Sequence, residues 1–198
     1  MADSIEAALE SDAPLPAAVH QHDIGKQLAE ERGWHEDALV GRTVTVNLPR
    51  QQLYEFWRDF RNLARFLENI ERVDVGDNRR SHWVVSAPLG RKVEWDSEIT
   101  EDEPGRLIAW ASTGGDIKNA GRIEFRDAPP GRGTQVTATI EYEPPAGDIG
   151  KLFAKLFQKE PKMQARRDLR RFKQLMETGE IAVSGPPAKP AADAPTQD

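Results

Sequence analysis

Between residues 42 and 178 the spacing of apolar residues changes twice, and each change predicts a different type of structure. The segment Arg42–Leu48 alternates and is rich in β-branched residues, which is typical of a strand. Pro49 ends this strand and suits the first turn of a helix. The apolar residues that follow recur at helical spacing: Leu53, Phe56, Trp57 and Phe60. Asn62 is a suitable cap for another turn, so we expect two short helices after the first strand.

From Ile70 onward the apolar period becomes two, which indicates strands. We expect them at about 70–76, 80–87, 91–101, 106–112, 118–126 and 134–143. Short breaks containing Gly, Pro, Asp or Asn separate them, so neighbouring strands should form antiparallel hairpins. With the strand at 42–48, the chain is expected to build seven strands.

The same alternation assigns residues to the two faces of the sheet. Trp95 and Ser97 fall on one side of their strand, while Glu94, Asp96 and Glu98 fall on the other. The second set also has members on later strands, namely Glu124 and Glu141. We interpret these carboxylates as a solvated outer surface and not as an acid–base cluster.

After Pro144 and Pro145 the helical period returns. Pro161 suits a first helical turn, and apolar residues follow it at spacings of four, three and four: Ala165, Leu169, Phe172 and Met176. This is the stripe of a helix that packs on a sheet, and Gly179 is its expected C-cap.

Both ends of the chain differ from this middle part. Residues 1–40 and the Pro/Ala-rich residues 181–198 contain little apolar surface, so we expect largely disordered tails around one domain at 41–180. The chain has no cysteine and no apolar run near the ~20 residues that span a bilayer. Its acidic start lacks the features of a secretion signal. These observations predict a cytoplasmic protein, with peripheral contact at the inner membrane face as an extension of that prediction.

The net charge of −6 hides a basic segment, because residues 151–173 hold nine Lys or Arg and two acids. An acidic protein of this kind does not suggest nucleic-acid binding. The basic segment begins with an amphipathic stretch whose lysines repeat every four residues. Its expected membrane or partner contacts are Lys151, Phe153, Lys155, Phe157 and Lys159. Packing of this stretch over the domain, with solvated lysines, is the alternative.

The order of one strand, two short helices, six strands and one long helix resembles a known architecture. The residues that carry the resemblance are Val44–Val46, Tyr54–Phe60, Val93–Ile99, Pro104–Trp110, Gly121–Phe125, Gly133–Val136 and Asp168–Phe172. They are similar to the helix-grip fold of the START and birch-pollen-allergen superfamily, SRPBCC. Within it, the chain resembles the polyketide cyclase/dehydrase and lipid-transport group, which includes coenzyme Q-binding START proteins.

The resemblance implies an α+β fold in which a curved seven-stranded antiparallel sheet surrounds the long C-terminal helix and leaves a cavity. The residues expected to line it are Phe56, Phe60, Trp83, Trp95, Ser97, Trp110, Asn119, Phe125, Tyr142, Leu169 and Phe172. Such a pocket suits a flat or lipid-like ligand. The alternative is that these rings simply fill the core.

Three functions remain open at this point. The first is binding or transport of a hydrophobic molecule such as a lipid, a quinone or a polyketide-like compound. The second is a polyketide-type cyclase or dehydratase, but the inward polar residues Ser97, Ser112, Asn119 and Tyr142 have no obvious base beside them. We therefore assign no catalytic residue and favour a noncatalytic protein. The third is a protein-interaction module that docks through the basic helix.

Neither a metal nor a cofactor is predicted. The four histidines do not occur at metal-ligand spacing, and phosphate-binding glycine loops are absent from the sequence.

Overall fold

The computed structural model describes residues 39–77, 79–87, 90–143 and 161–182, and they form one α+β domain. The elements are β1 (Leu39–Val46), α3 (Arg50–Arg58), the 3-10 helix η2 (Phe60–Arg65), β2 (Ile70–Val75), β3 (Arg80–Ser86), β4 (Lys92–Glu103), β5 (Leu107–Gly115), β6 (Lys118–Asp127), β7 (Thr134–Glu143) and α5 (Pro161–Thr178). The predicted order of elements is therefore confirmed. Most of both expected tails lies outside the described residues. Residues 39 and 40 already belong to β1, and Ile181 packs against the core.

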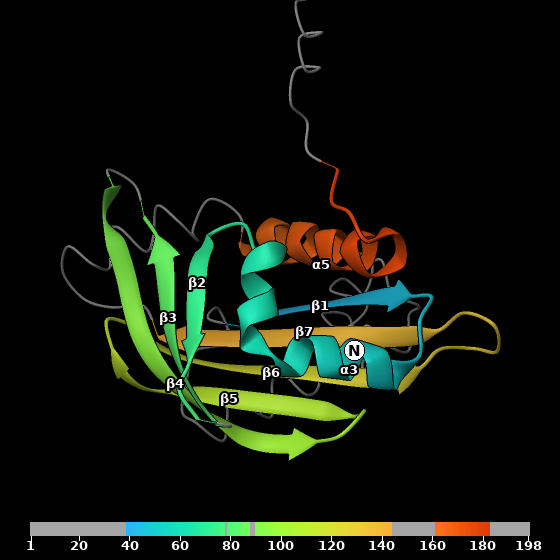
Figure 1. Ribbon diagram of the computed structural model, residues 1–198, viewed down its shortest axis with the longest axis horizontal. Coiled ribbons are helices and arrows are strands. Elements are labelled where there is room, and N and C mark those ends of the chain that lie inside the picture. The colour runs from blue at the N-terminus through green and yellow to red at the C-terminus, as the bar shows by residue number, and fades with distance from the viewer. Residues whose placement is uncertain (1–38, 78, 88–89, 144–160, 183–198) are drawn as a thin grey trace, which may run out of the picture.

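The seven strands form one antiparallel sheet in the order β1-β7-β6-β5-β4-β3-β2. Hairpins join each strand from β2 to β6 to the next strand in the chain. The last strand, β7, also pairs with the first strand, β1, from Leu39↔Glu141 to Val46↔Thr134. The register between β4 and β5 shifts at two places, after Asp96 and after Ile99. Such irregularities increase local bending, and the sheet curls into a half-barrel (Figure 1). This is the predicted helix-grip fold.

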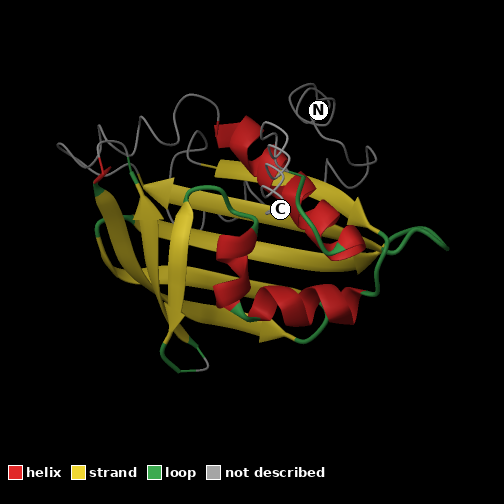
Figure 2. Cartoon of the chain, turned by 45° about the horizontal axis from the view of Figure 1, so that its top comes forward, coloured by secondary structure: helices red, strands yellow, loops and turns green. Residues whose placement is uncertain are grey.

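Helices α3, η2 and α5 all lie on the side toward which the sheet curls (Figure 2). In α3, Leu53 and Trp57 are four residues apart and both are buried, so one face of the helix packs inward. Pro49 was expected in the first helical turn, but it is the extended N-cap residue before Arg50, and its carbonyl accepts a hydrogen bond from Leu53 N at 3.3 Å.

The second short helix begins earlier than its predicted cap. Asp59, not Asn62, occupies the N-cap, and its carboxylate accepts a hydrogen bond from Arg61 N at 3.2 Å. Asn62 lies inside η2, where its side-chain amide donates to the carbonyl of Phe56 at 3.0 Å. Asp59 directly follows α3 and is both its C-cap and the N-cap of η2, so no longer linker is needed between the two helices.

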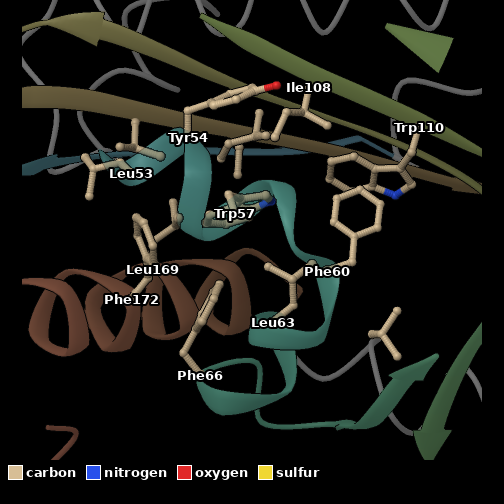
Figure 3. Packing of buried hydrophobic residues seen from close by; sticks show 14 of the residues in the cluster. Leu53, Tyr54, Trp57, Phe60, Leu63, Phe66, Ile108, Trp110, Leu169 and Phe172 are labelled. Carbon is tan, nitrogen blue, oxygen red and sulfur yellow. The ribbon is translucent and has the colours of Figure 1, made fainter. Parts of the chain in front are cut away.

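An aromatic cluster fixes α5 against the two short helices. Its members, which we call the phenylalanine cluster, are Phe56, Trp57, Phe66 and Phe172. The ring centroids of Trp57 and Phe172 are 4.9 Å apart, and those of Phe66 and Phe172 are 5.1 Å apart. Figure 3 shows these rings meeting between α5 and the helices of the N-terminal half. Phe66 and Phe172 are fully buried in this part of the interior.

The outer face of the sheet differs from the prediction at two carboxylates. Asp96 is exposed, as expected, but Glu124 and Glu141 are buried, with only 6% and 3% of their surface exposed. Glu124 accepts from Arg122 Nε at 3.1 Å, and Arg126 lies 3.5 Å away. Both carboxylates stand on β6 and β7, which have a neighbouring strand on each side. Alternation correctly assigned them to the outer face, but it does not measure how far neighbouring side chains cover that face.

Candidate ligand-binding cavity

A cavity of about 170 Å³ lies between the concave face of the sheet and the first half of α5. Its aromatic wall is formed by Trp57, Trp83, Trp95 and Trp110. Its aliphatic wall is formed by Leu63, Leu67, Ile70, Val85, Ile117, Ala138, Ile140, Ala165 and Leu169. Its polar residues are Asn69, Asn119, Gln164 and Asp168. Ile140 is 38% exposed, so the cavity wall meets solvent on the β7 side.

Three tryptophans from successive strands stand nearly parallel along one wall. Trp83 and Trp95 are direct partners across β3 and β4, and their rings lie 5.7 Å apart with 12° between the planes. Trp110 of β5 lies 6.4 Å from Trp83 at 15°. Gly121, the partner of Trp110 on β6, makes room for this arrangement, because a Cβ atom there would overlap the indole ring.

The indole N–H groups on this wall are not equally satisfied. Trp83 Nε1 donates to Ser81 Oγ at 2.9 Å. The Nε1 atoms of Trp57 and Trp95 are fully enclosed and have no hydrogen-bond acceptor among the described residues. Trp57 and Trp95 therefore offer mainly ring carbon, and not N–H groups, to the cavity.

The polar residues predicted on the inner face form one row across the sheet. Ser97 pairs with Ser112 across β4 and β5, and Asn119 pairs with Tyr142 across β6 and β7. The two pairs are joined because Ser112 Oγ accepts a hydrogen bond from Asn119 N at 3.0 Å. Ser97 Oγ and Asn119 Nδ2 have no partner within the described part of the chain. Asn119 lines the cavity, so the row brings one amide group without a partner to the cavity wall, while Ser97 lies behind it.

Asp168 is one of several lining residues that the sequence did not predict, and it is the acidic one. It lies on α5 at the cavity wall with 9% of its surface exposed, and both of its carboxylate oxygens accept from Gln164 Nε2 at 3.2 Å. Burial raises the pKa of Asp168 to about 6, although the Gln164 amide and the backbone N–H of Glu68 act in the opposite direction. Gln164 and Asp168 each neighbour a residue of the apolar stripe, Ala165 and Leu169. The spacing of four residues between Gln164 and Asp168, beside this stripe, is the sequence signal that could have placed both residues on the inner side of α5.

The structure brings only part of the predicted set to the cavity. Trp83, Trp95, Trp110, Asn119 and Leu169 line it. The expected residues that do not line it are Phe56, Phe60, Ser97, Phe125 and Phe172. The phenylalanines fill the space between elements instead: Phe60, for example, packs edge-on against Trp110 at 5.6 Å (Figure 3). The side chain of Tyr142 lies outside the described part of the structure.

The predicted contact residues Lys151, Phe153, Lys155, Phe157 and Lys159 also lie outside the described residues, so this contact stays a prediction. Within the described ranges, no helix is long and apolar enough to cross a membrane. The described residues contain no group of three His, Cys, Asp or Glu side chains placed to hold a metal. His82, on the outer face, is instead 2.9 Å from Asp96.

Comparison with known proteins gives three relevant similarities. A crystallised protein of Deinococcus radiodurans, DR_A0006, is 40% identical, with a TM-score of 0.58 over 72% of this chain and 99% of its own. An uncharacterized 17.2 kDa protein from the melC2-rnhH intergenic region of Streptomyces lincolnensis is 29% identical over 70% of this chain and 89% of its own. The ZhuI aromatase/cyclase of Streptomyces sp. R1128 shares the fold at 16% identity, with a TM-score of 0.54 over 73% of this chain and 98% of its own.

The family model described as polyketide cyclase/dehydrase and lipid transport matches residues 46–170. This range begins at the end of β1, includes the curled sheet and ends within α5, so it contains every residue that lines the cavity. The chain therefore belongs to the polyketide cyclase/dehydrase and lipid-transport family.

Proposed function

We propose that this protein binds and carries a hydrophobic small molecule, such as a lipid, a quinone or a polyketide-like compound, in the cavity beneath α5. The observation that carries the proposal is the lining of the cavity, where four tryptophans and nine aliphatic residues surround four polar ones. Burying apolar ligand surface contributes about 25 cal/mol per Å², so such a wall favours a hydrophobic occupant.

The size of the wall residues supports the same function. Ala138 and Ala165 face the cavity from β7 and α5, at positions where a larger residue could fill it. Ala138 is buried, with 8% of its surface exposed. Small side chains on two facing elements keep a space open that the phenylalanine cluster closes elsewhere.

Native mass spectrometry of protein purified from its own host tests the proposal. We expect a copurifying hydrophobic molecule in the parent protein and its loss in Ala138→Leu, which places three more carbon atoms in the cavity. Ala111→Leu is the matched control, because Ala111 lies on the outer face opposite Glu98 and should leave the bound molecule in place. A parent protein that is repeatedly empty would contradict the proposal.

A cyclase or dehydratase activity is the second candidate, and Asp168 is the observation that favours it. A carboxyl group with a pKa of about 6 can hold or release a proton near neutral pH. Asp168→Asn and Asn119→Ala should then abolish turnover of a candidate polyketide while its binding persists. Unchanged turnover in both variants would remove these residues from any catalytic role.

We further propose that residues 151–159 contact an anionic membrane, as their amphipathic sequence predicts. Replacing Lys151, Lys155 and Lys159 together with Glu should release the protein from anionic liposomes in a sedimentation assay. Absence of binding by the parent protein would end this proposal without affecting the cavity.

A further inference from the structure

The described wall of the cavity contains an acidic side chain but no basic one. Among the described residues that line the cavity, Asp168 carries a charge, and the others are apolar side chains or neutral amides. The described lining therefore contains a carboxylate but no Lys, Arg or His that could neutralise it.

The hydrogen bonds to Asp168 come from neutral donors. Gln164 Nε2 lies 3.2 Å from both oxygens, and Glu68 N is at a longer 3.4 Å. The charged groups that face it are Glu68, which opposes its ionisation, and Arg171 on the next turn of α5, which favours it. Glu68 itself is exposed and pairs with Arg167 at 3.3 Å. Arg171 does not line the cavity, so the carboxylate has no cation on its cavity side among the described lining residues, and burying it there is unfavourable.

The aromatic wall suits a cation, the kind of partner that Asp168 does not have among the described lining residues. The faces of indole rings carry negative electrostatic potential and attract cations, most strongly where water is excluded. Trp57 and Trp95 line the same cavity, and because their N–H groups are enclosed they present ring carbon to it. A carboxylate and four indoles therefore line one pocket, a combination of groups that suits an organic cation.

We propose that the cavity selects a hydrophobic molecule whose polar end is a protonated amine, which pairs with Asp168 while the apolar body lies against the tryptophans. This inference rests on the proposed binding function and specifies its ligand. It disfavours free fatty acids, because a second carboxylate would have to be buried beside the first.

Three probes that share one skeleton test the proposal: 2-naphthylmethylamine, 2-naphthylmethanol and 2-naphthoate, each titrated calorimetrically into the full chain at pH 7.5. We expect the amine to bind about tenfold or more tightly than the alcohol, as a charge-assisted contact predicts. We expect the carboxylate to bind more weakly than the alcohol.

Two variants separate the ion pair from general packing. Asp168→Asn should reduce amine affinity by about tenfold or more and change alcohol affinity by less than about threefold. Glu68→Gln is the matched control, since it removes a neighbouring exposed charge that does not line the cavity, and it should preserve the preference.

Equal affinity for the three probes, or an unchanged amine affinity in Asp168→Asn, would overturn the amine proposal while leaving hydrophobic binding intact. If none of the three probes binds and the cavity is also empty in native mass spectra, both the amine proposal and the proposed function are overturned.

Discussion

The phenylalanine cluster and the cavity share the same helix but differ in what that helix contributes. Phe172 of α5 is fully buried in the cluster, while Ala165, two helical turns earlier, lines the cavity. Trp57 belongs to both regions. One long helix can therefore hold the sheet firmly at one end and leave space at the other, because side-chain volume changes along a single stripe.

Removing Phe172 should produce the largest loss of stability. Phe172→Ala deletes a ring that contacts Trp57 and Phe66, so we expect the free energy of unfolding to fall by about 3–5 kcal/mol. Leu169→Ala should cost less, about 2–3 kcal/mol, because Leu169 already borders the cavity. Denaturant unfolding measures both values, and equal losses would contradict the distinction between solid and hollow regions.

Asp168→Asn should have the opposite effect on stability. The pKa of Asp168 in the folded protein, about 6, is above its ordinary value of 3.8, so the charged form destabilises the fold. Above pH 6 the variant should be more stable than the parent by up to about 3 kcal/mol.

The pH dependence checks this interpretation. As pH falls from 6 toward 3.8, the folded parent gains a proton that the unfolded chain does not, so its stability rises toward that of the variant. Thermal unfolding at pH 8 and pH 4 measures the change. A variant advantage that does not shrink at pH 4 would show that burial of the charge is not its cause.

Gly121→Ala tests whether the tryptophan wall depends on the absence of a side chain. The new Cβ would overlap the Trp110 ring, so we expect a loss of about 1–3 kcal/mol and weaker binding in the cavity. Gly114→Ala is the control, because a Cβ there has no atom within 4 Å and should change stability by less than about 0.5 kcal/mol.

The smallest expected effects compare a satisfied hydroxyl with an unsatisfied one. Tyr54 donates to Asp102 beside Phe125, so Tyr54→Phe should cost about 1 kcal/mol. Ser97 Oγ is buried without a partner among the described residues, so Ser97→Ala should be neutral or stabilising by about 1 kcal/mol. Chemical denaturation distinguishes these signs.

Tyr54 also predicts a loss of stability in alkali. Burial, aided by Asp102, raises the pKa of Tyr54 to about 12, so the unfolded chain loses this proton first as pH rises above 10. Stability should fall between pH 10 and 12 in the parent, and this contribution should be absent in Tyr54→Phe. Circular dichroism at fixed denaturant concentration follows the difference.

Sequence periodicity was enough to predict the elements and the face on which each residue lies. Trp83, Trp95 and Trp110 were correctly assigned to the inner face because alternation in a strand depends only on the backbone. Periodicity could not divide that face into filled and open parts. Whether Phe125 or Trp95 borders a cavity depends on the volumes of residues from other elements, such as Ala138 and Ala165.

The burial of Asp168 and Glu124 depends on contacts that the local sequence does not contain. Asp168 is polar and does not belong to the apolar stripe of α5, so its burial is seen only in the packing of α5 against the Glu68 backbone. Glu124 similarly becomes buried through the covering side chains of Arg122 and Arg126. For Glu124 alternation predicted the direction of the side chain, and for both residues long-range packing determines how much of the side chain is exposed.

The pairing of β1 with β7 has a consequence for the order in which the protein can be made. Thr43 and Thr137, whose hydroxyl oxygens are 2.9 Å apart, are separated by 94 positions, so the sheet cannot close until almost the whole domain has been synthesised. Contacts between such distant residues form slowly. Asp168 and Leu169 are translated later still, so the nascent chain lacks one wall of its cavity until α5 emerges from the ribosome.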